Sequence, residues 1–313
     1  MSSLLSEAPD PLPGHDGGSW APVRSETVAC WPQGHFAENL AIDSAGDVYV
    51  SLHSHHRIDR FHPRSRQVEN FARLDAPAAG LAFDAIGRLW VTGGTVGESP
   101  GYVWCIPPSG RPQLWVEVPD ALFMNGCAVH PDGQTLLVCE SLTGRILAID
   151  QDTQRWSVWL EDDQLRPKSA QMPGANGIKL HAGWAWISVT DHDRIMRVRI
   201  AADGSPGCLE TVATQLRADD FAFADSGALY IATHAAQTVV RLGADGTRTT
   251  LAGPREGAVG STACAFGRLS EDLACLYVTT TGGLLSPYQG QVQEAKLLRL
   301  SVGEHGGHLL HGS

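Results

Sequence analysis

The chain of 313 residues contains a short pattern of strand, glycine-containing turn and strand that recurs six times. The first two copies, Glu38–Val50 and Ala79–Val91, have the same spacing throughout. The sixth residue of each copy serves as a reference position, and successive reference positions are about 45 residues apart: Asp43, Asp84, His130, His181, Ala224 and Phe266. Self-similarity at a fixed period of this size is typical of solenoids and propellers.

A third alternating strand follows most copies, as in His56–Phe61 and Thr238–Leu242, and a fourth follows in places, as in Trp156–Leu160. Four strands per unit of about 45 residues are the signature of a propeller blade. The six units therefore predict an all-β chain, a six-bladed β-propeller with four-stranded antiparallel blades around a central tunnel. We expect Thr27–Trp31 to form the outer strand of the last blade and so close the ring. A β-sandwich is the alternative, which six evenly spaced copies disfavour.

The composition agrees with a turn-rich all-β chain. Glycine contributes 34 residues and proline 18, and 18% of residues are charged, against about 25% in an average soluble domain. This excludes all-helical folds and coiled coils. The predicted boundaries are a disordered lead-in over 1–25, a single propeller over 26–303 and a flexible tail over 304–313.

The charge balance restricts the possible partners. The net charge is −11 and the chain has three lysines, Lys168, Lys179 and Lys296, so we expect no binding to nucleic acid. No stretch approaches the roughly 20 apolar residues of a membrane span, and the N-terminus has no signal-peptide pattern. We therefore expect a cytoplasmic monomer or homodimer that acts on a small molecule and does not bind membranes. The seven scattered cysteines are typical of small buried hydrophobic residues.

The innermost strand of every propeller blade runs along the tunnel, so equivalent residues at its start form a ring around the axis. This ring position lies five residues before each reference position and holds Glu38, Ala79, Asn125, Asn176, Asp219 and Ser261. Two carboxylates in a narrow space repel each other unless a cation compensates them. Oxygen ligands suit Ca²⁺, Mg²⁺ or Mn²⁺, and Zn²⁺ less naturally. The ring predicts one divalent metal ion, preferably calcium. The alternative is that these Asn and Asp residues only begin strands and turns.

Several short segments also resemble a known family. They are Asn176–Ile178, Asp219–Ile231, Cys264–Gly267 and Leu276–Thr279, in that order and at those distances. Together they resemble the senescence-marker-protein, gluconolactonase and luciferin-regenerating-enzyme family of regucalcin-like propellers. The resemblance implies a six-bladed propeller with one divalent metal at the tunnel mouth and, commonly, lactone hydrolysis. It implies Glu38, Asn176 and Asp219 as metal ligands, and Asn125 as a contact to the substrate or to metal-bound water.

The chain departs from this family at four places. Asn39-Leu40 follows Glu38 where the family has Gly-Pro, and Phe123 replaces an arginine that grips sugar acids. Asp220 and Arg268 each replace a glycine. We therefore expect a substrate other than a sugar-acid lactone, and a pocket that is apolar on the side of Phe123.

Catalytic candidates come from the ring and from the loops that follow the second strand of each blade, because these loops surround the same tunnel mouth. The resemblance implies that Asp219 acts as general base. Asp191, His55 and His234 are candidates to position water or the leaving group, and Glu140 is a candidate substrate contact. The sequence contains no Gly-x-Ser-x-Gly segment that would support a serine nucleophile.

The favoured function is a metal-dependent hydrolase that opens a lactone or related ester. A metal-dependent lyase or isomerase acting on a non-sugar small molecule is the first alternative, since a metal and a general base serve that chemistry equally well. A non-catalytic binding propeller is the second. The mass of the product separates the two enzymes, and the absence of bound metal would favour the third reading.

Overall fold

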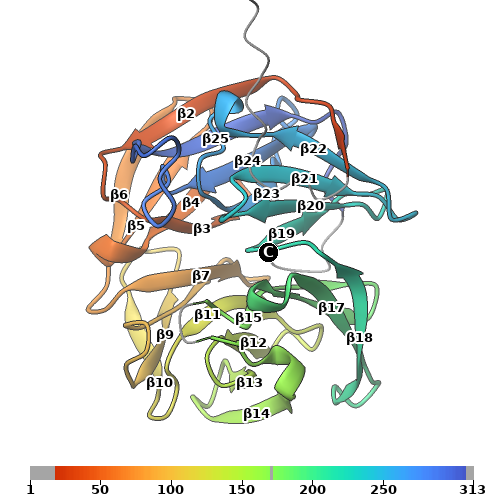
Figure 1. Ribbon diagram of the computed structural model, residues 1–313. Helices are drawn as coiled ribbons and strands as arrows, with labels where there is room; N and C mark the ends of the chain where they lie inside the picture. Colours follow the sequence, from red (N-terminus) through yellow and green to blue (C-terminus); the bar gives the residue numbers. More distant parts are fainter. Residues whose placement is uncertain (1–17, 170–171, 308–313) are drawn as a thin grey trace, which may run out of the picture.

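The computed structural model describes residues 18–169 and 172–307, and it confirms the six-bladed β-propeller (Figure 1). Six sheets surround a central axis, and strands β3, β7, β11, β15, β19 and β23 lie nearest to it. The described helices are short 3-10 turns, none of them long and apolar enough to cross a membrane.

In blades one to five the chain runs from the inner strand outward through three antiparallel hairpins, and in blade six the outer strand comes from the N-terminal segment. Blade one comprises β3 (Ala37–Ile42), β4 (Val48–Leu52), β5 (Arg57–His62) and β6 (Gln67–Arg73). Blade two comprises β7 (Ala78–Phe83), β8 (Leu89–Gly93), β9 (Gly101–Ile106) and β10 (Gln113–Val118). Blade three comprises β11 (Met124–Val129), β12 (Thr135–Glu140), β13 (Arg145–Asp150) and β14 (Trp156–Glu161).

The second half of the chain repeats this arrangement. Blade four comprises β15 (Ala175–His181), β16 (Trp184–Val189), β17 (Arg194–Ile200) and β18 (Pro206–Thr214). Blade five comprises β19 (Phe221–Phe223), β20 (Leu229–Thr233), β21 (Thr238–Leu242) and β22 (Arg248–Ala252). Blade six comprises β23 (Ser261–Phe266), β24 (Cys275–Thr280), β25 (Ala295–Ser301) and β2 (Ser25–Trp31).

The N-terminal segment closes the ring. Strand β2 pairs antiparallel with β25, which confirms the predicted outer strand of the last blade. A short strand β1 (Ser19–Trp20) then pairs in parallel with β22 of blade five. The predicted disordered lead-in over 1–25 is therefore corrected for its second part, which is ordered by strand pairing, while 1–17 lie outside the described residues.

The hydrophobic core is divided into six clusters, each between two neighbouring blades. Trp90 of blade two packs with Met124 and Leu136 of blade three, for example, and Leu52 of blade one packs with Tyr277 and Leu297 of blade six. Hydroxyl groups reinforce these contacts, since Ser51 Oγ donates to the carbonyl of Ala79 in the next blade at 2.7 Å. The blades therefore hold the inner strands, and the residues at their starts, at fixed places around the tunnel.

Candidate active site

The predicted ring position coincides with an irregularity of the inner strands. Five of the six inner strands shift register against their neighbour at this point, for example between Ala37 and Asn39 in β3 and between Ala175 and Ile178 in β15. A bulge bends the strand and re-aims a side chain, which is why bulges are common beside active sites. We call the end of the tunnel that carries this position the ring end, and the opposite end, where the β3–β4 turn lies, the turn end.

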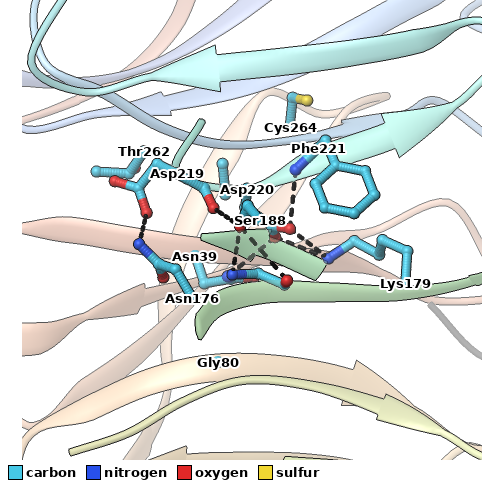
Figure 2. A network of polar contacts seen from close by, with 12 residues as sticks. Asn39, Gly80, Asn176, Lys179, Ser188, Asp219, Asp220, Phe221, Thr262 and Cys264 are labelled. Carbon is cyan, nitrogen blue, oxygen red and sulfur yellow. Dashed lines mark hydrogen bonds and ion pairs between the residues drawn. The ribbon is translucent and has the colours of Figure 1, made fainter. Parts of the chain in front are cut away.

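Three of the predicted metal-binding side chains lie close together at the ring end, since Asn176 donates to Asp219 and the charge of Asp219 acts on Glu38. Glu38, Asn125, Asn176 and Asp219 are all buried, with 2–8% of each residue exposed. Asn176 donates from Nδ2 to Asp219 Oδ1 at 2.8 Å (Figure 2). The same Nδ2 also donates to Thr190 Oγ1 at 2.9 Å. Because both donors of this amide are engaged, its oxygen is left to bind a ligand. The side-chain amide of Asn125 makes no hydrogen bond within the described part of the chain, although its backbone carbonyl accepts one from Thr92.

The two carboxylates of the ring are electrostatically strained. Burial raises the pKa of Glu38 well above its ordinary value, and the neighbouring carboxylates of Asp219 and Asp220 raise it further. Burial also raises the pKa of Asp219, against the opposing effect of His234, whose Nδ1 lies 3.4 Å from Asp219 Oδ2. Among the described residues, no lysine or arginine forms an ion pair with Glu38 or Asp219. The ring end therefore favours a bound cation.

This donor set fits a hard divalent metal ion. It offers two carboxylates and the free amide oxygen of Asn176, which is the chemistry that Ca²⁺ and Mg²⁺ prefer. Across residues 18–169 and 172–307 there is no group of three or more His, Cys, Asp or Glu residues arranged to hold a metal. A metal site at the ring end would thus need amide oxygens as ligands in addition to the carboxylates of Glu38 and Asp219.

A second polar network lies next to the ring and was missed by the sequence analysis. Lys179 donates from Nζ to both carboxylate oxygens of Asp220, at 2.8 and 2.7 Å, and Asn39 donates to Asp220 at 3.2 Å (Figure 2). The sequence alone could have singled out Lys179, because it is the one charged residue at its position in the repeat. The other five copies have alanine or cysteine there: Ala41, Ala82, Ala128, Ala222 and Cys264. The pair explains how the chain tolerates Asp220 in place of a family glycine.

Aromatic rings surround the mouth of the ring end. Phe36 contacts His234 edge-on at 5.5 Å between ring centroids and lies 5.9 Å from His53, which in turn lies 6.2 Å from Phe123. His53 Nδ1 lies 3.0 Å from the carbonyl of Ala78, and burial lowers the pKa of His53. The predicted apolar side at Phe123 therefore extends to Phe36 and His53, which the sequence analysis did not select.

His55 lies apart from this arc. It follows His53 in the 3-10 turn η1 (His53–His55), is exposed and stacks on His35 at 3.6 Å between centroids. A turn of three residues points its first and third side chains in different directions, so His53 is half-buried at the mouth while His55 faces solvent. Of the three predicted positioning residues, only His234 contacts Asp219.

The two remaining candidates, Asp191 and Glu140, hold loops in place. Asp191 accepts a hydrogen bond from the backbone amide of Ser169 at 2.8 Å. Glu140 is fully buried and accepts from the backbone amides of Leu122 and Phe123, at 3.0 and 2.9 Å. Its side chain is therefore enclosed by protein, so the predicted substrate contact is corrected to a role in positioning Phe123.

Fold and site together define a six-bladed propeller with buried carboxylate and amide side chains at one end of its inner strands. The chain is similar in structure to the calcium-binding protein regucalcin from Agrobacterium tumefaciens, with a TM-score of 0.71 and 17% identity over 93% of this chain and 98% of that chain. It is equally similar to a luciferin-regenerating enzyme, with a TM-score of 0.71 and 16% identity over 93% and 99% of the two chains. A gluconolactonase from Xanthomonas campestris has a TM-score of 0.67 and 15% identity over 91% of each chain. Regucalcin, luciferin-regenerating enzyme and gluconolactonase are the proteins to which the sequence was found to be similar above. All three structures share the fold of this chain.

Among curated proteins, the chain is similar to one from Phoma sp. described as a "Putative hetero-Diels-Alderase". The two are 25% identical, over 86% of this chain and 90% of the Phoma protein. A comparison with protein-family models finds no match for the sequence.

Proposed function

We propose that the protein is a divalent-metal-dependent hydrolase that opens a lactone or related ester at the ring end of its tunnel. The observation that carries this proposal is the pair of buried carboxylates of Glu38 and Asp219. Asp219 lies beside the amide of Asn176, and neither carboxylate pairs with a lysine or arginine among the described residues. The resemblance to gluconolactonase-like sequences and the shared fold support it.

In this proposal Glu38, Asn176 and Asp219 hold the metal ion, preferably calcium. A bound divalent ion would polarise the substrate carbonyl and lower the pKa of water. Asp219 accepts a proton from the attacking water, which is the role that the family resemblance implies for it. His234 keeps Asp219 oriented through Nδ1, and its Nε2 lies 3.2 Å from Thr281 Oγ1. In the same proposal, Asn125 donates from its amide to the substrate or to the attacking water.

The proposed substrate is apolar rather than a sugar acid. Phe36, His53 and Phe123 form an aromatic arc over the mouth of the ring end, and hydrophobic rings bind alkyl or aryl groups in preference to hydroxyl-rich ones. Phe123 also stands where a family arginine would bind a sugar carboxylate.

The first experiment is equilibrium dialysis of the chelated protein against Ca²⁺, Mg²⁺, Mn²⁺ or Zn²⁺, followed by elemental analysis. We expect one ion per chain, lost in Asp219→Ala and Glu38→Gln and retained in Asp191→Asn, a matched carboxylate outside the ring. Alkyl- and aryl-substituted lactones should be opened with added metal, and activity should fall about 100-fold or more in Asp219→Ala. Lactone hydrolysis that persists in full after chelation would contradict the proposal.

The Phoma relative supports a second candidate, an enzyme that rearranges or joins its substrate without adding water. That relative is similar over most of both chains, and an aromatic arc also suits a conjugated substrate. Product mass distinguishes the two. A hydrolase adds the mass of one water to a single substrate, whereas an isomerase leaves the mass unchanged and a cycloaddition gives the sum of two reactants.

A further inference from the structure

The turn end of the tunnel holds a cavity that the proposed hydrolase does not use. Its volume is about 810 Å³, within the range of about 300–1,000 Å³ that is usual for small-molecule sites. Its lining comes from inner strands beyond the ring position and from the turns that follow them, such as Asp43–Ser44 and Asp84–Gly87. We call this cavity the turn-end chamber.

The walls of the turn-end chamber are mainly apolar. Leu40, Leu81, Val129, Ala222 and Phe266 contribute to them from five different blades. Ala222 is half-buried, so the space beyond its methyl group belongs to the chamber. An apolar ligand enclosed by such walls gains binding free energy in proportion to the apolar area that it removes from water.

The charged groups at the rim of the chamber already have partners in the protein. Asp84 accepts from the Arg88 guanidinium and from Trp90 Nε1, at 2.5 and 3.0 Å. Asp43 accepts from Tyr49 and from backbone amides of its own turn, and Arg60 pairs with Glu69. Arg268 also lines the chamber, and its positive charge interacts with the negative charge of Asp43. These groups therefore provide no strong selection for a charged ligand.

Lys179 is the polar group that lines the chamber from its inner end. An ammonium group has three N–H donors, and two of them are directed to Asp220 Oδ1 and Oδ2. The third has no hydrogen-bond acceptor among the described residues. Asp220 compensates the charge of Lys179, so the inner end offers one donor without a net positive charge.

The mouth of the chamber is bordered by exposed apolar side chains. Ile86 is 71% exposed and Leu273 is 39% exposed, and both line the opening. They come from blades two and six, on turns far apart in the sequence. Exposed apolar side chains that gather at the rim of a cavity are typical of a ligand-binding site.

We propose that the turn-end chamber binds a neutral, mainly apolar small molecule whose single hydrogen-bond acceptor takes the free N–H of Lys179. The apolar walls provide most of the affinity, and Lys179 orients the ligand. The site is separate from the ring end and uses none of the ring residues. The proposal is therefore independent of the proposed hydrolase activity.

Two fluorescent probes test the chamber. The neutral naphthyl ketone prodan carries a carbonyl acceptor, and diphenylhexatriene is a hydrocarbon without one. We expect both to bind saturably to the full chain, with blue-shifted emission for prodan. Ala222→Phe, which adds a phenyl ring to the wall of the chamber, should weaken both by at least about tenfold, whereas Ala201→Phe, the same change at an exposed turn, should change neither. Absence of saturable binding, or equal binding to Ala222→Phe, would overturn the proposal.

The role of Lys179 needs a variant that keeps the charge balance, since Lys179→Met alone leaves Asp220 buried without a partner. In the double variant Lys179→Met/Asp220→Asn, prodan should bind about three- to tenfold more weakly while diphenylhexatriene binds as before. Equal effects on the two probes would refute the acceptor contact. Glu38→Gln should change neither probe, which keeps this result distinct from failure of the metal site.

Discussion

Glu38 is the residue on which the proposed metal site depends most. Its carboxylate is buried beside Asp219 and Asp220 and contacts no cation among the described residues. The neighbouring Asp220 differs, because Lys179 compensates it at 2.7 Å. The negative charge of Asp220 is therefore compensated within the protein, whereas that of Glu38 is not. Of the two, only Glu38 favours a bound cation.

The raised pKa of Glu38 predicts a pH dependence of stability in the chelated protein. Above its ordinary value of 4.5 the unfolded state releases the proton while the folded state still holds it, so stability falls as pH rises until the folded pKa is passed. Glu38→Gln removes this loss. By calorimetry with chelator, we expect a higher Tm than the parent at pH 8 and a similar Tm at pH 4.5. The exposed control Glu98→Gln should follow the parent, and a Tm difference that is constant with pH would contradict the prediction.

Glu140 stabilises the loop before β11 by accepting hydrogen bonds from its backbone amides. Besides Leu122 and Phe123, it accepts from the backbone amide of Thr143 at 2.7 Å. Glu140→Gln replaces an acceptor with a donor and leaves a buried N–H unpaired, so we expect a loss of about 2 kcal/mol in the free energy of unfolding. Urea unfolding measures this, with the exposed Glu117→Gln as a control near zero. A loss below about 0.5 kcal/mol would show that the loop does not depend on these bonds.

At the scale of the element, the bulges of the inner strands determine the ring. The residues that follow the ring position pack directly against the next blade, and several are glycine because no side chain fits there. A Cβ on Gly126 would lie 2.5 Å from the carbonyl oxygen of Asn176 and 2.9 Å from the Cα of Gly177. The ring is thus positioned by backbone contacts between blades three and four.

Gly126→Ala should therefore disturb the site without touching any ligand. The new methyl group meets backbone atoms, which move less easily than a flexible side chain, so we expect about 1–3 kcal/mol of destabilisation. Metal affinity should fall several-fold because Asn176 is displaced. Gly207→Ala, on outer strand β18 with its nearest contact at 3.2 Å, is the matched control. Unfolding curves and metal titration measure both, and parent-like metal affinity in Gly126→Ala would argue against this account.

At the scale of the whole molecule, one outer strand joins the two ends of the propeller. Trp31 in β2 is 4% exposed and packs in the cluster between blades six and one. Its Nε1 donates to Asp59 Oδ2 of blade one at 2.8 Å. Since Asp59 also pairs with Arg57 at 2.8 Å, closure of the ring is tied to a buried polar group as well as to strand pairing.

Trp31→Ala should weaken this closure strongly. Loss of a large buried side chain together with the bond to Asp59 is expected to cost about 3–5 kcal/mol. Trp20→Ala, at the exposed strand β1, should cost much less. Guanidinium unfolding followed by circular dichroism checks both variants, and equal effects of the two would mean that β2 is not the strand that secures the ring.

The sequence by itself determined the architecture and the composition of the ring. Six copies at one period define six blades, and the alternation within each copy defines its strands, because a strand pattern depends on local spacing alone. The same period placed Glu38, Asn176 and Asp219 at equivalent positions although they lie far apart in the chain. Thr27–Trp31 was predicted as the closing strand because it precedes the first blade and would protect the open edge of the last one.

Only the tertiary structure decided which way each side chain faces and what it meets. The direction of His53 and His55 depends on a 3-10 turn, the burial of Glu140 depends on a neighbouring loop, and the ion pair of Lys179 depends on Asp220, which lies outside its own blade. These are contacts between segments distant in sequence. Their outcome follows from packing in three dimensions, which a one-dimensional pattern does not contain, and the turn-end chamber became visible only once the blades were assembled.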